Sequence, residues 1–332
     1  MLSRIRIFNQ QNIFLFLLLL MVIFGKFLPF KESYQQVFNL DAFINWGIVG
    51  IFFLYGLKLN FKKVIQDISN WRLHLLVQGT TFVLFPFLVF VFYGLAVNTE
   101  YYALWLSVFF LACLPSTVSS SVVMVSIAKG NITSAIFNAS ISGLIGIVMT
   151  PLLMGFFLQQ SGESTLDQSE IVMQLLLKVL LPIILGLLLH RFFVKVVNKY
   201  SKIIAQFDKL IILLIVYESF SAAFLQNAFS SVSVQILMVL FLSLVLLFFL
   251  VYYILKFISN KMNFSREDTI TATFCGSKKS LIHGSLFVLI LGISDDQKVL
   301  FLLPILLYHS FQLFYVSWLA NRVAKTTEIN NE

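Results

Sequence analysis

The chain has 332 residues, of which 59% are hydrophobic and 11% charged, and its mean hydropathy is +0.92. Soluble domains of this length carry far more charge, so the composition excludes a soluble globular protein and indicates a polytopic membrane protein. The net charge of +8 fits basic loops at a membrane face better than a nucleic-acid-binding surface.

Apolar runs of about 20 residues predict an all-α protein with ten membrane-spanning helices. In chain order the predicted spans are 13–30, 41–57, 72–94, 101–128, 131–158, 170–190, 203–226, 233–258, 267–292 and 297–320. The first run follows Arg4 and Arg6 but has no small-residue cleavage site. We therefore expect a helix there and not a signal peptide.

The distribution of basic residues predicts the orientation of the chain. Three of the 23 Lys and Arg fall on one side of the predicted membrane, namely Lys26, Lys31 and Lys298. Three more lie inside spans, namely Lys178, Lys278 and Lys279. The other 17 lie on the side of the N-terminus, which predicts a multi-pass protein of the cell membrane with both termini in the cytoplasm.

The fourth and ninth spans contain similar segments. FFLACLPSTVSSSVV (109–123) and TATFCGSKKSLIHGS (271–285) each have an apolar lead, a cysteine, a helix-breaking Pro or Gly and a polar cluster. The offset between Cys113 and Cys275 contains five spans, an odd number, so the two halves must have opposite topology. The sequence predicts two inverted five-helix repeats, residues 1–160 and 161–332. The cysteines indicate neither a disulfide framework nor a metal site.

The polar cluster of the fourth span predicts a broken helix. Pro115 removes a backbone donor, and five nearby hydroxyls offer other partners to the backbone. These are Ser116, Thr117, Ser119, Ser120 and Ser121. Helix ends at the middle of a membrane present partial charges to ions, as in transporters. The alternative is an unbroken helix whose small residues pack closely against a neighbour.

The ninth span places Lys278 and Lys279 among Gly276, Ser277 and Ser280. A charge at the bilayer centre costs at least ~2.5–3.5 kcal/mol, so two adjacent lysines need a reason. We expect one to pair with Glu218 in the seventh span. The other would meet a substrate anion, or release its proton and act as a proton carrier. The alternative is that the span is shifted so that both lysines reach water.

Other polar groups within spans are candidates for the same site. Asn138 and Ser142 share a helix face and are predicted to look towards the break in the fourth span. Gln78 would either take part in the site or cross-link helices. His283 would either relay protons or be a core residue whose hydrogen bonds are satisfied within the protein. The chain has no hydrolase, metalloprotease or phosphate-loop motif, so an enzyme is not expected.

The motifs resemble those of the bile acid:sodium symporter family. The resemblance covers the whole ten-span layout and is carried by ACLPSTVSSSVV, GNITSAIFNASISGLIGIVMTPLL (130–153) and FCGSKKSL (274–281). It implies that helices 1, 2, 6 and 7 form a panel and that helices 3–5 and 8–10 form a core, in which the discontinuous helices 4 and 9 cross. It also implies that an amphipathic organic anion binds between panel and core.

The sodium ligands that the resemblance implies are only partly present. The corresponding positions are Ser120 and Ser121 after the fourth-span break, Ala135 and Ala139 on the fifth span, and Phe274 and Lys278 on the ninth. Hard cations need several oxygen ligands, preferably with a carboxylate. Ser120 and Ser121 are the residual sodium positions, and most of the other ligands are replaced.

The sequence therefore predicts a secondary transporter of an amphipathic organic anion that works by alternating access. Its lysine ammonium would supply the charge of sodium, which makes the protein an uncoupled carrier or a proton-coupled one. The alternative is a non-transporting regulatory or receptor-like protein with the transporter fold. No cofactor is expected apart from a coupling ion, sodium or a proton. The expected partners are the anion and the lipid bilayer, not nucleic acid, and a homo-oligomer is left open.

Overall fold

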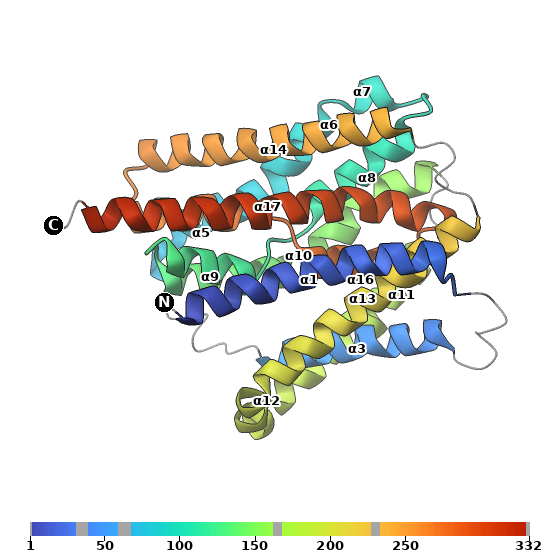
Figure 1. Cartoon of the computed structure of the whole chain (residues 1–332), viewed down its shortest axis with the longest axis horizontal. Helices are drawn as coiled ribbons and strands as arrows, with labels where there is room; N and C mark the ends of the chain where they lie inside the picture. Colours follow the sequence, from blue (N-terminus) through green and yellow to red (C-terminus); the bar gives the residue numbers. More distant parts are fainter. Residues whose placement is uncertain (1, 31–38, 59–67, 162–167, 227–232, 330–332) are drawn as a thin grey trace.

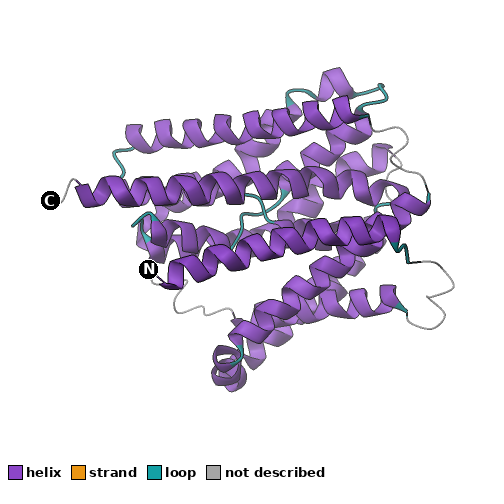
Figure 2. Ribbon diagram, viewed as in Figure 1, coloured by secondary structure: helices purple, strands orange, loops and turns teal. Residues whose placement is uncertain are grey.

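The computed structural model describes residues 2–30, 39–58, 68–161, 168–226 and 233–329. Within these ranges the regular elements are all helices, and none is a strand (Figure 2). Helix α1 begins and helix α17 ends at the same end of the molecule (Figure 1). An even number of membrane crossings would give this arrangement.

The helices follow the apolar runs of the sequence. In the first half they are α1 (Leu2–Phe27), α3 (Leu40–Lys58), the short η1 (Ile68–Asn70), α5 (Trp71–Gly79), the π-helical η2 (Thr80–Leu84), α6 (Phe85–Phe90), α7 (Tyr93–Ala96), α8 (Tyr102–Cys113), α9 (Ser119–Ile127) and α10 (Ile132–Ser161). In the second half they are α11 (Gln168–Leu175), the π-helical η3 (Leu176–Leu180), α12 (Leu181–Lys199), α13 (Ser201–Leu225), α14 (Val234–Lys261), α15 (Arg266–Gly276), α16 (Leu281–Ile290) and α17 (Asp295–Ile329).

Six helical segments of the described chain are long and apolar enough to cross a membrane. They are Leu40–Lys58, Trp71–Phe90, Ile132–Gly155, Met173–Lys199, Val234–Lys261 and Gln297–Ala324. The fourth and ninth predicted spans are each divided into two short helices, and α13 carries Asp208, Lys209 and Glu218. The all-helical membrane fold is confirmed, and the count of ten spans stays a prediction.

Helices α1, α3, α12 and α13 pack on one another and form a group of their own. The closest approach in this group is between α3 and α12. Gly56 faces the backbone of Ile183, and Gly186 faces the backbone of Phe53, so a Cβ at either glycine would clash with main-chain atoms. Small residues allow membrane helices to approach this closely.

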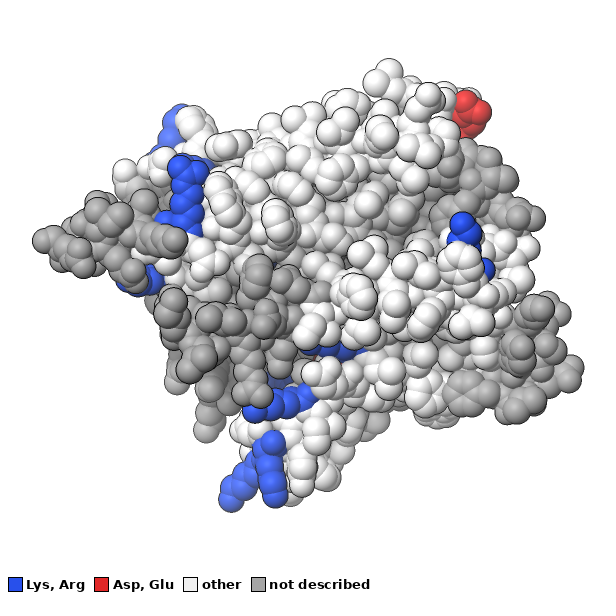
Figure 3. Space-filling view, viewed as in Figure 1, with Lys and Arg blue, Asp and Glu red and all other residues white. Residues whose placement is uncertain are grey.

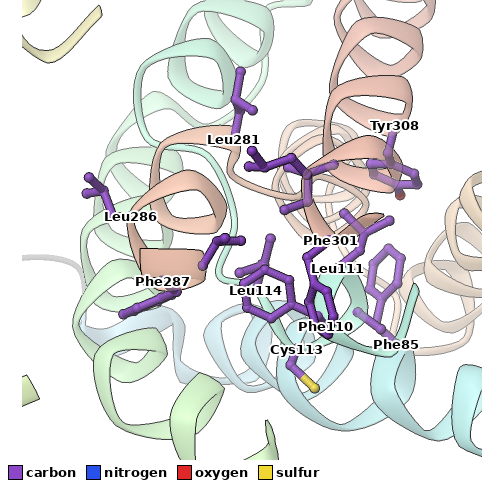
Figure 4. Close-up of a cluster of buried hydrophobic side chains, with 14 of the residues drawn as sticks. Phe85, Phe110, Leu111, Cys113, Leu114, Leu281, Leu286, Phe287, Phe301 and Tyr308 are labelled. Carbon is purple, nitrogen blue, oxygen red and sulfur yellow. The ribbon is translucent and has the colours of Figure 1, made fainter. Parts of the chain in front are cut away.

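The other long helices form a second group, in which α8, α10, α14, α15 and α17 pack against one another. Its centre contains large buried apolar side chains from α6, α8, α16 and α17, among them Phe85, Phe110, Leu281, Phe301 and Tyr308 (Figure 4). Contacts between the two groups run mainly from α13 to α16 and α17. The polar residues of the fourth and ninth predicted spans therefore lie inside an apolar surround.

Candidate functional site

The first helix interruption lies between α8 and α9 and follows from Pro115. Helix α8 ends at Cys113, and the next residue is extended, with φ −70° and ψ 150°. A proline disfavours the helical conformation of the residue before it and has no N–H to donate. Side chains of α10 replace the lost partners: Thr150 Oγ1 donates to Cys113 O at 2.8 Å, and Ser142 Oγ accepts from Ser116 N at 2.9 Å. The predicted break is therefore present.

The second interruption separates α15 from α16 over residues 277–280. Ser280 caps α16, because its Oγ accepts a hydrogen bond from His283 N at 3.3 Å. Tyr308 of α17 donates its hydroxyl to Ser277 O at 2.7 Å. Side chains thus replace the helical partners that the interruption removes.

The two interruptions meet. Ser280 N donates to Pro115 O at 2.9 Å, and Ser116 Oγ donates to Cys275 O at 2.6 Å. We call the meeting point of residues 114–118 and 277–280 the crossing. The alternative of a hydroxyl-rich but continuous helix is excluded, since neither helix runs through.

Lys279 binds main-chain oxygens of η2 and of the C-terminal end of α8. Its Nζ donates to Thr81 O at 2.7 Å, Ala112 O at 2.6 Å and Leu114 O at 2.8 Å. It also lies 4.2 Å from the centre of the Phe85 ring, a cation–π contact. A carbonyl oxygen only accepts, so three such bonds need three N–H donors, which an ammonium has and a neutral amine lacks. The Lys279 ammonium thereby caps the negative end of α8.

The π-helical turn η2 makes one of these carbonyls available. Phe85 N donates to Thr80 O, five residues back. Pro86, the next residue, has no N–H, so the following backbone bond of the series, to Thr81 O, cannot form. Lys279 takes the place of the missing donor. Single π turns occur frequently at functional sites.

Gln312 of α17 fixes the backbone of the same lysine. Its Oε1 accepts from Lys279 N at 2.9 Å, and its Nε2 donates to Lys279 O at 2.8 Å. The Nε2 atom also lies 2.9 Å from His309 Nδ1. All polar groups of Lys279 are therefore bonded within the protein.

Lys278 has a different environment. Its side chain is fully buried, at 0% exposure, and its Nζ donates to Ser120 O at 3.1 Å. Within the described part of the chain no second acceptor lies within hydrogen-bonding distance of this ammonium. Ser120 belongs to the first turn of α9, where the helix dipole is positive and does not favour a cation. Lys278 is therefore buried, and its Nζ uses only one of the hydrogen bonds that it could donate.

The predicted pairing of one of these lysines with Glu218 is wrong. Glu218 lies on α13, and its Oε1 is 4.0 Å from Lys298 Nζ. The lysines of the crossing use backbone oxygens, which the fold places nearer than any carboxylate. The alternative that both lysines reach water is also excluded, since Lys278 and Lys279 are at most 1% exposed.

The hydroxyl groups at the start of α9 bond to one another. Thr117 Oγ1 lies 2.8 Å from Ser120 Oγ and 2.9 Å from Ser121 Oγ. All three side chains are buried, and Ser120 carries the carbonyl that Lys278 contacts. The side chain of Ser119 lies outside the described part of the chain.

Asn138 and Gln78 form a polar cluster between α5 and α10. Gln78 Nε2 donates to Asn138 Oδ1 at 3.1 Å and to Asn138 O at 3.0 Å, and Asn138 Nδ2 lies 2.9 Å from His74 Nδ1. Ser142, one turn along α10, reaches the crossing, whereas Asn138 bonds to α5. Gln78 therefore cross-links two helices beside the crossing.

His283 connects the crossing to the four-helix group. Its Nδ1 lies 2.9 Å from Ser280 Oγ, and its ring meets the Tyr55 ring edge-on at 6.3 Å. Tyr55 of α3 donates its hydroxyl to Ser140 O of α10 at 2.9 Å. Gly143 makes room for this contact, since a Cβ there would collide with the Tyr55 hydroxyl.

A cavity of about 330 Å³ lies between the two groups at the end of the molecule opposite the termini. We call it the outer cavity. Its polar lining residues are Asp41, Asn45, Gln174, Lys178, Glu218, Ser294 and Lys298. Lys178 Nζ donates to Asn45 Oδ1 and Gln174 Oε1, both at 2.9 Å. Lys178 therefore lines the cavity and is held there by two side-chain amides.

The positions that correspond to sodium ligands do not offer a set of oxygens. Ala135, Ala139 and Phe274 are buried and apolar at the side chain, and Lys278 supplies a nitrogen and no oxygen ligand. The described residues contain no group of three or more His, Cys, Asp or Glu side chains that could hold a metal ion. Ser120 and Ser121 remain as hydroxyls bonded to Thr117.

Sequence reasoning missed several residues of the crossing. Gln312, Tyr308, Thr150 and Pro86 all contact or shape it, but each is a lone polar residue or proline within an apolar run. Gln312 carried a usable signal, because an uncharged amide within a span needs a polar partner. Pro86 has no N–H, but this leaves Thr81 O without a backbone donor only because the preceding turn is π-helical.

Two broken helices that meet among buried polar groups are typical of membrane transporters. Residues 12–325 match the SBF-like CPA transporter family. The chain belongs to this family, which is part of the bile acid:sodium symporter family, as the resemblance indicated.

Three relatives illustrate the match. An uncharacterized protein of Pseudomonas aeruginosa is 35% identical over 309 residues, which is 92% of this chain and 90% of the relative. A candidate symporter of Escherichia coli named YfeH is 32% identical over 97% of this chain and 96% of its own. Sodium/bile acid cotransporter 7 of Rattus norvegicus is 28% identical over 80% of this chain and 78% of its own. The chain is thus similar over nearly its whole length to membrane transport proteins.

Proposed function

We propose that this chain is a secondary transporter that carries an amphipathic organic anion across the cell membrane by alternating access. The observation that carries the proposal is Lys278, a fully buried cation with one hydrogen bond beside the positive end of α9. An anion at this point would interact favourably with both. Membership of a transporter family favours transport over the non-transporting alternative and over an enzyme.

The proposed architecture is ten spans in two inverted repeats, residues 1–160 and 161–332, with both termini in the cytoplasm. Every predicted interval contains a helix or a broken pair of helices, and the two breaks fall in the fourth and ninth intervals. The four-helix group of α1, α3, α12 and α13 contains the helices expected in the panel, and the second group contains those expected in the core. This packing supports a rigid panel and a rigid core.

Alternating access would follow from the burial of the crossing. Lys278 has no exposed surface, so an anion can reach it only after panel and core move apart. The outer cavity lies between the two groups and marks one entry. The Tyr55 contact with His283 and Ser140 is a candidate closure on the path from the crossing to the panel.

The coupling that we propose does not use sodium. Lys279 donates to three carbonyl oxygens that would otherwise be free to bind a cation, and the sodium-ligand positions lack a carboxylate. A lysine ammonium is covalently attached and cannot cross the membrane with the substrate as sodium does. The first version of the proposal is therefore an uncoupled carrier or exchanger. Proton coupling through Lys278 is the second version, because its single bond does not require the charged form.

Uptake into proteoliposomes tests the proposal, with radiolabelled taurocholate as the first probe and other amphipathic carboxylates and sulfonates after it. The gradients should be sodium, proton, both or none. We expect uptake that does not depend on sodium, and a response to pH separates the two versions. Uptake driven by sodium would contradict the assignment of Lys279. Failure of all probes to be taken up, together with no thermal stabilisation by any of them in detergent, would contradict transport of such anions.

A further inference from the structure

The lipid-facing side of α12 changes character along its length. Leu181, Leu188 and Phe192 are exposed, at 46%, 64% and 63%. The opposite side of the helix, with Ile183 and Gly186, is buried against α3. Positions seven residues apart share a face of an α-helix, so this apolar face leads directly to Lys195.

Basic residues replace the apolar ones in the last turns of this face. Arg191, Lys195 and Lys199 follow one another at intervals of four residues, and Lys202 is the second residue of α13. All four are exposed. We call them the basic stripe. In Figure 3, Lys and Arg side chains project from the lower edge of the molecule, where α12 lies in Figure 1.

The length of the helix places the stripe at the boundary of the bilayer. The segment Met173–Lys199 is apolar enough to cross a membrane. From Met173 to Lys195 the rise is about 33 Å at 1.5 Å per residue, close to the ~30 Å of a hydrocarbon core. The ammonium of Lys195 would therefore lie at the level of the lipid headgroups.

The stripe has aromatic neighbours that suit this level. The Arg191 guanidinium lies 4.5 Å from the centre of the Phe192 ring, and Lys199 Nζ lies 5.4 Å from that of Tyr200. Aromatic and basic residues together are enriched at membrane interfaces. They point outwards to lipid, not towards the crossing.

Among the residues that the structure describes, no Asp or Glu forms an ion pair with the stripe. The sequence from Gly186 to Phe207 contains neither Asp nor Glu, and the next residue, Asp208, is bonded to Lys58 at 3.0 Å. The end of α14 offers a contrast. There Lys256 and Lys261 are also exposed beside an apolar face, but two carboxylates, Glu267 and Asp268, follow closely in the chain.

We propose that the basic stripe binds the headgroups of anionic phospholipids. Three cations on one face of α12 and a fourth in the first turn of α13, with no ion pair to a carboxylate among the described residues, complement the negative charge of lipid phosphates. Because α12 packs on α3, bound lipid would hold the four-helix group at the boundary of the bilayer. The proposal does not depend on which anion is transported, or on whether one is.

Lipid titration of the purified, delipidated protein tests the proposal, with native mass spectrometry as the readout. The probes are phosphatidylglycerol and phosphatidylcholine. We expect tighter binding of phosphatidylglycerol, weakened by raising the salt concentration. The variant Lys195→Gln/Lys199→Gln should lower this affinity about 25-fold, since each lysine near the surface contributes about fivefold.

Two further variants complete the test. Lys256→Gln/Lys261→Gln removes the same charge from α14 and should lower the affinity less than fivefold, while Lys195→Arg/Lys199→Arg should retain it. Equal binding of the two lipids would overturn the proposal. An equal loss in the α14 variant would also overturn it, because net charge and not the stripe would then be responsible.

Discussion

Lysines occur at both the crossing and the outer cavity, and the two sites hold them in different ways. At the crossing, Lys279 binds three backbone carbonyls in a fully buried site. In the outer cavity, Lys178 binds side-chain amides and Lys298 faces Glu218 at 4.0 Å. Backbone partners are fixed by the fold, whereas side-chain partners can turn to water. A buried lysine therefore becomes part of the helix framework when main-chain oxygens surround it.

Removing the Lys279 ammonium should have the largest effect. In Lys279→Met three buried carbonyls lose their donor, and each unsatisfied group costs ~1–3 kcal/mol, so we expect a loss of at least ~3 kcal/mol in the free energy of unfolding. Thermal unfolding in detergent measures it. The matched control is Lys298→Met in the outer cavity, which should remain within about 1 kcal/mol. Equal melting temperatures for both variants would show that the hydrogen bonds of Lys279 do not stabilise the fold.

Most of the scaffold of the crossing could be predicted from the sequence, because single residues determine it. Pro115 breaks its helix through its own ring, and the polar run around Gly276 marks the second break. Glu218 could not be placed, because its distance from the lysines depends on how α13 packs on α16 and α17. The three partners of Lys279 are main-chain atoms, which carry no residue signature. The availability of one of them, Thr81 O, depends on a π turn that the sequence of span 72–94 does not reveal.

The amide of Gln312 should come next in size. It bonds both the N–H and the C=O of Lys279, which have no helical partners in the interruption. Gln312→Leu leaves both buried groups unsatisfied, so we expect a loss of ~2–3 kcal/mol in the free energy of unfolding. Ser310→Ala is the control, because Ser310 is exposed and bonds back to its own helix at Leu306 O. If the two variants unfold alike, the amide does not hold the crossing.

The adjacent Lys278 should separate stability from transport. Its one acceptor, Ser120 O, lies in α9 and keeps its helical bond without the lysine. Removing a weakly bonded buried charge is often neutral, so Lys278→Met should change the free energy of unfolding by less than ~1 kcal/mol. Uptake of an anion that the wild-type protein carries should nevertheless fall at least tenfold. Uptake at the wild-type rate in a well-inserted Lys278→Met would remove Lys278 from the proposed anion site.

The smallest effect should come from the outer cavity, where the comparison with the crossing is most direct. Glu218 and Lys298 are 15% exposed at the side chain, and their atoms are 4.0 Å apart, longer than a charge-assisted hydrogen bond. Glu218→Gln should therefore change the free energy of unfolding by about 0.5 kcal/mol or less, and added salt should reduce the difference. Melting curves of both proteins at low and high salt measure it. A loss as large as that of Lys279→Met, insensitive to salt, would mean that the cavity pair is as fixed as the crossing. In that case the contrast between backbone and side-chain partners would not explain how this protein holds charge within a membrane.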